Sequence, residues 1–221
     1  MQQKTALIVG ATGAIGRKLT PVLAAAEGVT RLIVLHRRAT SFAGLPKVEE
    51  QIIDFGALEQ TSIEGGVDAV FCCIGTTQKK AGSTRAFQRV DRDIPIALAR
   101  WAAGQGAAVF VAVSSLGADA GSKSVYMRTK GEMEAGVAAV GVPATYILRP
   151  SLLQGERDEF RLAERVGNRV LGIVGPLMIG SLERYRAVPT EVVAKAMLRC
   201  AERADPGVHI LESEAVQALG R

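Results

Sequence analysis

The sequence predicts an α/β fold built on a doubly wound parallel sheet, and three observations support this prediction. Apolar, β-branched runs alternate with helical patterns along most of the 221 residues. The runs are almost continuously hydrophobic, as expected of strands that are buried on both faces of a parallel sheet. The first run ends in a glycine-rich turn, Gly10–Gly16, from which a helix begins. Helical crossovers between parallel strands account for all three observations.

Six strands and several helices follow from the pattern in chain order. The expected strands are Thr5–Val9, Arg31–Leu35, Val48–Ile53, Ala69–Cys73, Ala108–Val113 and Ala144–Leu148. The clearest helices are Ile15–Ala26, which Pro21 should kink, Ser83–Gly104 and Val125–Val140. Val188–Glu191 is typical of a turn and N-cap before a helix that continues to Arg199. These elements predict a single Rossmann-type domain over residues 1–221.

Residues 151–187 have a different character and are expected to form a small C-terminal substrate lobe over the strand ends. Arg161, Arg165 and Arg169 recur on one helical face. Such a row is usually a solvated face, and binding of an anionic substrate or partner is the alternative. Leu171–Gly180 is apolar and interrupted by glycines, which fits a pocket wall, a lid or a contact with another subunit.

The composition indicates a soluble globular protein from a reducing compartment. Hydrophobic residues make up 48% of the chain, which excludes overall disorder. The net charge of +5 comes without a run of like charges, so a nucleic-acid partner is poorly supported. Cys72-Cys73 lies in an apolar run and suits a buried strand better than a disulfide. With no signal peptide and no apolar stretch that could span a bilayer, we expect a cytoplasmic location. No metal site is expected.

The glycine-rich turn predicts a dinucleotide site. A strand that enters a helix through glycines presents free N–H groups and the positive end of the helix dipole to a phosphate. Gly10 is expected to form the tight turn, Gly13 to let the backbone approach the pyrophosphate, and Gly16 to allow close packing of helix and strand. The other expected cofactor contacts in this loop are Thr12, Ala14 and Ile15.

The end of the second strand favours NADP(H) over NAD(H). Arg37 and Arg38 stand where NAD-selective sites usually place a carboxylate for the ribose 2′-hydroxyl. A guanidinium suits a 2′-phosphate because it forms paired, charge-assisted hydrogen bonds. The preceding His36 is expected to pack at the strand end rather than to act in catalysis.

Two further strand ends are candidates for cofactor contacts. Asp54 follows the third strand, where it could bind the adenine amino group or simply cap a turn. Gly75, Thr76 and Thr77 follow the fourth strand, where their backbone and hydroxyl groups could line the cofactor's path; an ordinary loop is the alternative.

The strongest catalytic signal combines a serine pair with a YxxxK spacing. Tyr126 and Lys130 are four residues apart, so they share one face of a helix. A nearby ammonium group favours the phenolate form and makes a tyrosine a better acid or base near neutral pH. Ser114 and Ser115 close the fifth strand, and a serine hydroxyl there can hold a substrate oxygen.

The glycine turn and the YxxxK pair resemble the short-chain dehydrogenase/reductase superfamily. Further motifs extend the resemblance over nearly the whole chain to the atypical oxidoreductases of the Tat-interacting-protein type. These motifs are GATGAIG at Gly10–Gly16, Arg37-Arg38, CIGTT at Cys73–Thr77, VDRD at Val90–Asp93, SSLGAD at Ser114–Asp119, YMRTKGEME at Tyr126–Glu134 and LRPSLL at Leu148–Leu153.

The resemblance implies a Rossmann fold, NADP(H) binding and a Ser-Tyr-Lys centre. It implies that Tyr126 is the acid or base and that Lys130 binds the nicotinamide ribose and tunes the tyrosine. Ser115 would position the substrate, with Ser114 as second choice because adjacent serines leave the register open. It also places the pyrophosphate on the three glycines of the turn and the 2′-phosphate on Arg37 and Arg38.

The expected function is that of an NADPH-dependent oxidoreductase acting on a small carbonyl or alcohol substrate. One alternative is an NADP(H)-binding redox sensor with little turnover, which the arginine row and Leu171–Gly180 motivate. A sugar-nucleotide epimerase or dehydratase is less favoured, because the stretch between Ser115 and Tyr126 is short for that class. A homodimer through the helices at 83–104 and 125–140, or a protein partner, is left open.

Overall fold

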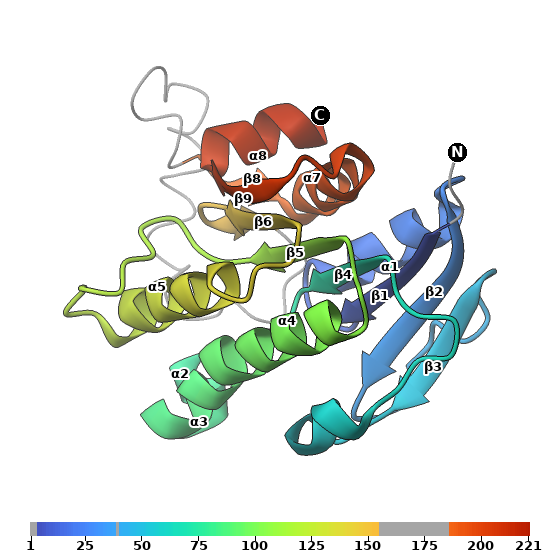
Figure 1. Cartoon of the computed structure of the whole chain (residues 1–221). Helices are drawn as coiled ribbons and strands as arrows, with labels where there is room; N and C mark the ends of the chain where they lie inside the picture. The colour runs from blue at the N-terminus through green and yellow to red at the C-terminus, as the bar shows by residue number, and fades with distance from the viewer. Residues whose placement is uncertain (1–3, 39, 155–185) are drawn as a thin grey trace.

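A seven-stranded parallel sheet lies between two layers of helices in the computed structural model, which describes residues 4–38, 40–154 and 186–221 (Figure 1). The strand order is β3-β2-β1-β4-β5-β6-β9, and every neighbouring pair is parallel. The chain moves outward from β1 through β2 to β3 and then returns to the other side of β1. This order confirms the doubly wound, Rossmann-type prediction.

All six predicted strands are present, with bounds that differ from the expected ones by only a residue or two. They are β1 (Lys4–Val9), β2 (Val29–His36), β3 (Val48–Ile52), β4 (Ala69–Cys72), β5 (Val109–Val113) and β6 (Ala144–Arg149). The prediction lacks the seventh strand, β9 (Gly207–Glu212). As an edge strand, β9 leaves Val208 and Ile210 about half exposed and has no buried apolar run to reveal it.

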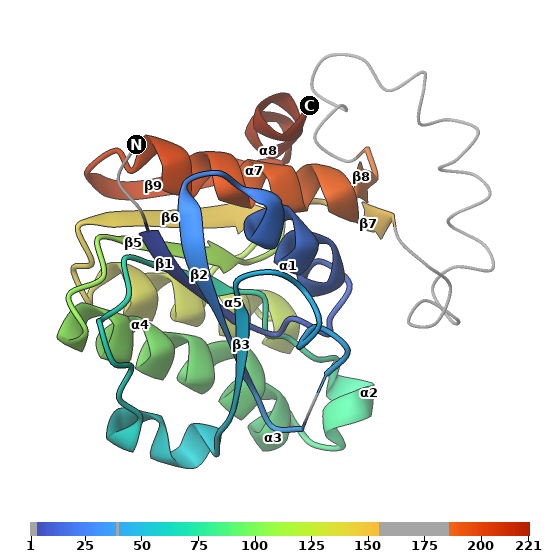
Figure 2. The same ribbon diagram turned by 90° about the vertical axis from the view of Figure 1, so that its right-hand side faces the viewer.

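Helices cover both faces of the sheet (Figure 2). The longer ones are α1 (Gly16–Ala25), α4 (Ile94–Gly104), α5 (Val125–Ala138), α7 (Thr190–Arg203) and α8 (Ser213–Gly220). The shorter ones are the 3-10 helix η1 (Phe55–Gln60) and the α-helices α2 (Gln78–Ala81) and α3 (Thr84–Gln88). No helix in these parts of the chain is both long enough and apolar enough to cross a membrane.

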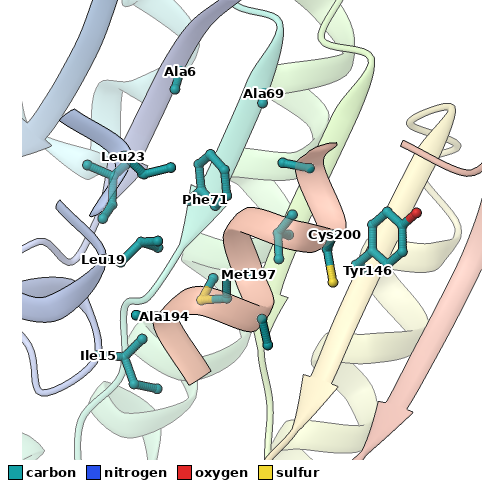
Figure 3. Packing of buried hydrophobic residues seen from close by; sticks show 14 of the residues in the cluster. Ala6, Ile15, Leu19, Leu23, Ala69, Phe71, Tyr146, Ala194, Met197 and Cys200 are labelled. Carbon is teal, nitrogen blue, oxygen red and sulfur yellow. The ribbon is translucent and has the colours of Figure 1, made fainter. Parts of the chain in front are cut away.

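Successive residues of the central strands point to opposite faces and form two apolar layers. On one face, Ala6 packs with Leu19 and Leu23 of α1 and with Met197 of α7 (Figure 3). On the other face, Leu7 belongs to the layer formed with α4 and α5. Because the side chains on both faces of these strands are buried, the hydrophobic runs are continuous in the sequence.

Helix α1 runs as one helix through Pro21, as expected, and the kink expected at this residue stays a prediction. One local expectation about a helix boundary is wrong. Val188–Glu191 is not a turn with a side-chain cap. Val188–Pro189 forms β8, which pairs with β7 (Leu153–Gln154), and the proline's extended backbone leads directly into α7.

The predicted helix Ser83–Gly104 is interrupted by a π-turn, η2 (Arg89–Asp93), between α3 and α4. Ser83 caps α3 by accepting a hydrogen bond from the Ala86 amide at 3.1 Å. The extra residue of a π-turn changes the direction of the following side chains, and such turns often occur at functional sites. Here the turn contains Asp91, whose side chain is fully buried.

The three cysteines are free thiols, as their place in apolar segments suggests. Burial raises the pKa of Cys72 to about 11 and that of Cys200 to about 12. Burial, and then the neighbouring Cys72, also raises the pKa of the Cys73 thiol well above its ordinary value. All three are therefore protonated near neutral pH and poor nucleophiles.

We expect the native protein to react slowly with a thiol-specific disulfide reagent at mildly alkaline pH. The same protein unfolded in urea should react rapidly at all 3 cysteines. The measurement is the time course of reagent release before and after unfolding. A native thiol that reacts as fast as the unfolded ones would contradict the burial described above.

Candidate active site

The candidate site lies at the carboxyl edge of the sheet, where the strand order reverses between β1 and β4. Ligands of doubly wound proteins bind in the crevice outside such a reversal, because the adjoining loops diverge to opposite faces. A narrow cleft of about 230 Å³ occupies this position. Its walls come from the glycine turn, the loop after β4, the end of β5 and helix α5; they include Gly13, Ala14, Ile15, Gly75, Thr76, Thr77, Ser114, Tyr126 and Lys130.

The glycine turn is held by a close backbone approach. Gly10 has a φ of +87°, and a side chain there would come within 2.6 Å of the Cys73 backbone. At Gly16 an added Cβ would lie 2.1 Å from the Gly10 carbonyl oxygen. The first glycine thus forms the turn and the third permits the start of α1 to pack against it. Gly13 lies between them on the cleft wall, and its amide donates to the Gly10 carbonyl at 3.0 Å.

The residues of this turn fit the phosphates of a dinucleotide. The backbone amides of Thr12, Ala14 and Ile15 donate no hydrogen bond to any described residue. They lie immediately before α1, where the helix dipole adds positive potential. Unused donors at the beginning of a ten-residue helix are suited to an anion.

At the end of β2 the structure places the carboxylate of Glu50, a residue that is distant from this position in the sequence. Arg37 and Arg38 are exposed, and the His36 ring is hydrogen-bonded to the Arg38 carbonyl. The His36 Nε2 atom lies 3.6 Å from the Glu50 carboxylate on the neighbouring strand β3. Glu50 also accepts hydrogen bonds from the amide and hydroxyl of Thr40. His36 is therefore a buried packing residue that orders the arginine turn, as expected.

The Asp54 carboxylate caps η1 by accepting a hydrogen bond from the Gly56 amide at 2.9 Å. This is the capping alternative of the two weighed for that residue. The structure does not place Asp54 on the wall of the narrow cleft, whereas it brings Gly75, Thr76 and Thr77 onto that wall.

The Ser-Tyr-Lys residues converge from β5 and α5. Tyr126 is 36% exposed, and its ring stacks on Phe87 at a centroid distance of 5.9 Å. Ser114 is buried, and its hydroxyl has no hydrogen-bond partner among the described residues. Ser115 is half-buried, with a long contact of 3.4 Å from its hydroxyl to the Leu116 carbonyl. The Ser115 hydroxyl is thus the more accessible of the two, whereas the Ser114 hydroxyl lacks a partner but is shielded from solvent. The register of the serine pair stays open.

Lys130 is paired with a residue that the sequence motifs do not assign. Its ammonium lies 2.8 Å from Asp91 Oδ1, and both side chains are buried. The other carboxylate oxygen, Oδ2, accepts the Thr76 amide at 2.8 Å. Asp91 thereby links α5 to the loop after β4 within the narrow cleft. Asp91 belongs to the VDRD motif. Its burial and its role become clear only from the π-turn and from the contact with Lys130, which lies 39 positions later in the chain.

A second, broader cleft of about 1070 Å³ adjoins the first. Ser114 and Tyr126 line both clefts, so they stand at the boundary between them. The broader cleft continues along Leu116, Met127 and the segment after β6, and it ends at Glu212 and Glu214. Of its lining residues, Ser151, Leu152 and Leu153 belong to the predicted substrate region, 151–187.

Most of the predicted substrate lobe, residues 151–187, lies outside the described residues. The same is true of the arginine row at 161, 165 and 169 and of Leu171–Gly180. The lobe, the sensor interpretation and the homodimer therefore stay predictions.

Comparison with known proteins agrees with the geometry. The profile of a family described as "NAD(P)H-binding" matches residues 10–204. Protein HTATIP2 of Rattus norvegicus is 32% identical over 100% of this chain and 91% of its own length. The protein fmp52, mitochondrial, of Emericella nidulans is 33% identical over 96% of this chain and 93% of its own. The resemblance to Tat-interacting-protein relatives is thus confirmed.

Solved structures share the fold at low sequence identity. An oxidoreductase of the short-chain dehydrogenase/reductase family from Burkholderia thailandensis superposes with a TM-score of 0.72 at 17% identity, covering 98% of this chain and 94% of its own. MoeE5 in complex with UDP-glucose and NAD gives a TM-score of 0.67 at 15% identity, with coverages of 98% and 80%. At these identities the likeness shows the fold alone.

The expected cytoplasmic location is contradicted by the names of the relatives. Several fungal Fmp52 proteins that match this chain are named mitochondrial. The sequence argument rested on the expected lack of a secretory signal and of a membrane-spanning run, together with the unpaired cysteines. These features argue against an oxidising compartment but do not choose among reducing ones.

We expect Asp91→Asn to destabilise the protein by about 3–5 kcal/mol, because it leaves the buried Lys130 charge without its counter-ion. The nearly isosteric amide keeps the shape of the side chain. The measurement is the free energy of unfolding from urea titration.

Asp93→Asn is the matched control, since Asp93 belongs to the same π-turn but pairs with Arg92 at the surface. We expect the free energy of unfolding of this variant to fall by no more than about 1 kcal/mol. Equal losses of unfolding free energy in the two variants would show that the buried Asp91–Lys130 pair stabilises the protein no more than the surface pair does.

Proposed function

Since the chain belongs to the NAD(P)H-binding family, together with HTATIP2 and the Fmp52 proteins, we propose that it is an NADPH-dependent oxidoreductase acting on a carbonyl or alcohol. One observation carries the proposal. Tyr126 and Ser114 line both the narrow cleft with its phosphate-binding turn and the broad cleft beside it. Groups at such a boundary can reach a substrate in one cleft and a cofactor in the other.

Each residue of the centre has a role that its position supports. When bound, a nicotinamide cofactor supplies the hydride for the carbonyl carbon. The Tyr126 hydroxyl donates a proton to the alkoxide oxygen in the reduction and accepts it in the reverse direction. A serine hydroxyl, Ser115 or Ser114, donates a hydrogen bond to the same oxygen and stabilises its developing charge. Lys130, held by Asp91, provides positive charge beside the tyrosine and donors for a ribose.

The preference for NADPH rests on the arginines at the end of β2. Arg37 and Arg38 are exposed there. The nearby Glu50 does not compete for this role, because its carboxylate is already engaged by Thr40 and lies beside His36. A 2′-phosphate would therefore meet two exposed guanidinium groups rather than a carboxylate.

We expect Tyr126→Phe to lower turnover by about 10²-fold or more, because it removes the proton donor while keeping the ring that stacks on Phe87. Since the substrate is not identified, the measurement is mass spectrometry of a metabolite extract incubated with NADPH and either protein. A metabolite consumed only by the native protein would identify the substrate. Binding of NADPH should be retained by the variant.

Two outcomes would contradict this mechanism. A variant that consumes the same metabolite as fast as the native protein would exclude Tyr126 as the proton donor. A native protein that binds NADPH but consumes no metabolite would favour the redox-sensor alternative.

We expect replacement of Arg37 and Arg38 by Ala to weaken NADPH binding roughly 10- to 100-fold, with little effect on NADH, because charge-assisted hydrogen bonds to the 2′-phosphate are lost. Dissociation constants from fluorescence titration provide the test. Arg100→Ala removes an exposed charge from α4 and serves as the control. Equal losses for the two cofactors would refute the 2′-phosphate assignment.

A further inference from the structure

We propose that the broad cleft takes a carbonyl compound with an uncharged, largely apolar body, and that Glu212 and Glu214 select against anionic substrates. The inference rests on the proposed oxidoreductase function and adds the substrate class to it. Three features of the cleft support it: its apolar wall, the engagement of its arginine, and its surplus of carboxylates.

The wall beside Tyr126 is mainly apolar. Leu116 and Met127 contribute from the β5–α5 side, and Pro150, Leu152 and Leu153 contribute from the segment after β6. The volume of about 1070 Å³ exceeds what a carbonyl group alone requires. An apolar substrate body would replace water along this wall, and that replacement is favourable.

The arginine of the cleft is already paired with two carboxylates. Arg149 Nε donates to both oxygens of Glu134 at 3.0 and 3.2 Å, and Nη2 donates to Oε2 at 2.5 Å. Nη1 donates to Glu212 at 2.8 Å. These hydrogen bonds also raise the pKa of Arg149 above its ordinary value. The positive charge of Arg149 is therefore already balanced by two carboxylates, so it attracts a further phosphate or carboxylate only weakly.

The charges around the cleft favour a neutral or positive ligand. Arg149 is the single cation among the described lining residues, against the lining carboxylates Glu212 and Glu214 and the buried Glu134 behind them. Glu214 accepts no hydrogen bond from any described residue. Arg186 and Arg221, the nearby described arginines in the C-terminal region, line a separate hollow of about 190 Å³.

An anionic group beside the described lining residues would lose hydration and gain two carboxylate neighbours, and the cation among those residues, Arg149, is already paired. Both effects disfavour binding. A pyrophosphate-bearing sugar nucleotide carries such charges, so the cleft opposes the epimerase or dehydratase alternative. A neutral aldehyde or ketone incurs neither cost.

The test uses two aldehydes that differ only in charge, the methyl ester and the free carboxylate of formylnaphthoic acid. Their kcat/KM values with NADPH are measured from the loss of NADPH absorbance. We expect the native protein to favour the ester at least tenfold. The double variant Glu212→Gln/Glu214→Gln should reduce this preference at least threefold, because it removes the repelling charges and frees one Arg149 nitrogen.

Glu27→Gln is the matched control. By the same kind of substitution it removes one carboxylate charge from an exposed position just beyond the end of α1, at the opposite edge of the sheet, and should leave the ratio unchanged. A native protein that handles the carboxylate as well as the ester would overturn the inference. So would a preference that the double variant does not reduce.

A binding measurement separates this inference from the proposed function. Calorimetric titration of the unreactive methyl ester and carboxylate of methylnaphthoic acid, with NADP⁺ present, needs no turnover. Tighter binding of the ester without any aldehyde reduction would refute the oxidoreductase and support the charge selection. Tighter or equal binding of the carboxylate, or binding of neither compound, would overturn the charge selection.

Discussion

The arrangement of the site depends on one buried ion pair, Asp91–Lys130. Its partners belong to a π-turn before α4 and to α5, and the Thr76 amide adds the loop after β4. A charge inside a protein requires a partner in contact, so this pair fixes the distance between three elements that are separate in the sequence. Lys130 sits one helical turn after Tyr126 on the same face of α5, and therefore the pair also sets where the tyrosine stands at the boundary of the two clefts.

The sequence is informative wherever the decisive contact is local. Buried parallel strands produce apolar runs, so six strands could be placed closely, and glycine spacing locates the turn before α1. The Tyr126–Lys130 pair is equally local, since both residues lie within one helical turn. Resemblance to a known family strengthens these assignments. It predicts no residue contact beyond those that the spacing of the motif residues already indicates.

What the sequence does not reveal depends on contacts between distant segments. Asp91 looks like an ordinary helix residue until the π-turn and Lys130 give it a partner. Glu50 is remote in sequence from His36 but adjacent to it across the β2–β3 pair. The network of Arg149 joins α5, β6 and β9, and β9 itself lacks a buried apolar run because it is an edge strand. Pairing across a sheet, rather than propensity, decides each of these cases.

The two clefts have opposite electrostatic character, so they are suited to different ligands. The narrow cleft has free amides before a helix and two exposed arginines at the neighbouring end of β2, which attract a polyanionic cofactor. The broad cleft has an arginine already paired with carboxylates, and one further carboxylate, that of Glu214, which has no partner among the described residues. An anion that enters from solvent is therefore drawn to the first and repelled by the second. Tyr126 lines both clefts, so under the proposed function it would meet a cofactor in the first and an uncharged carbonyl in the second.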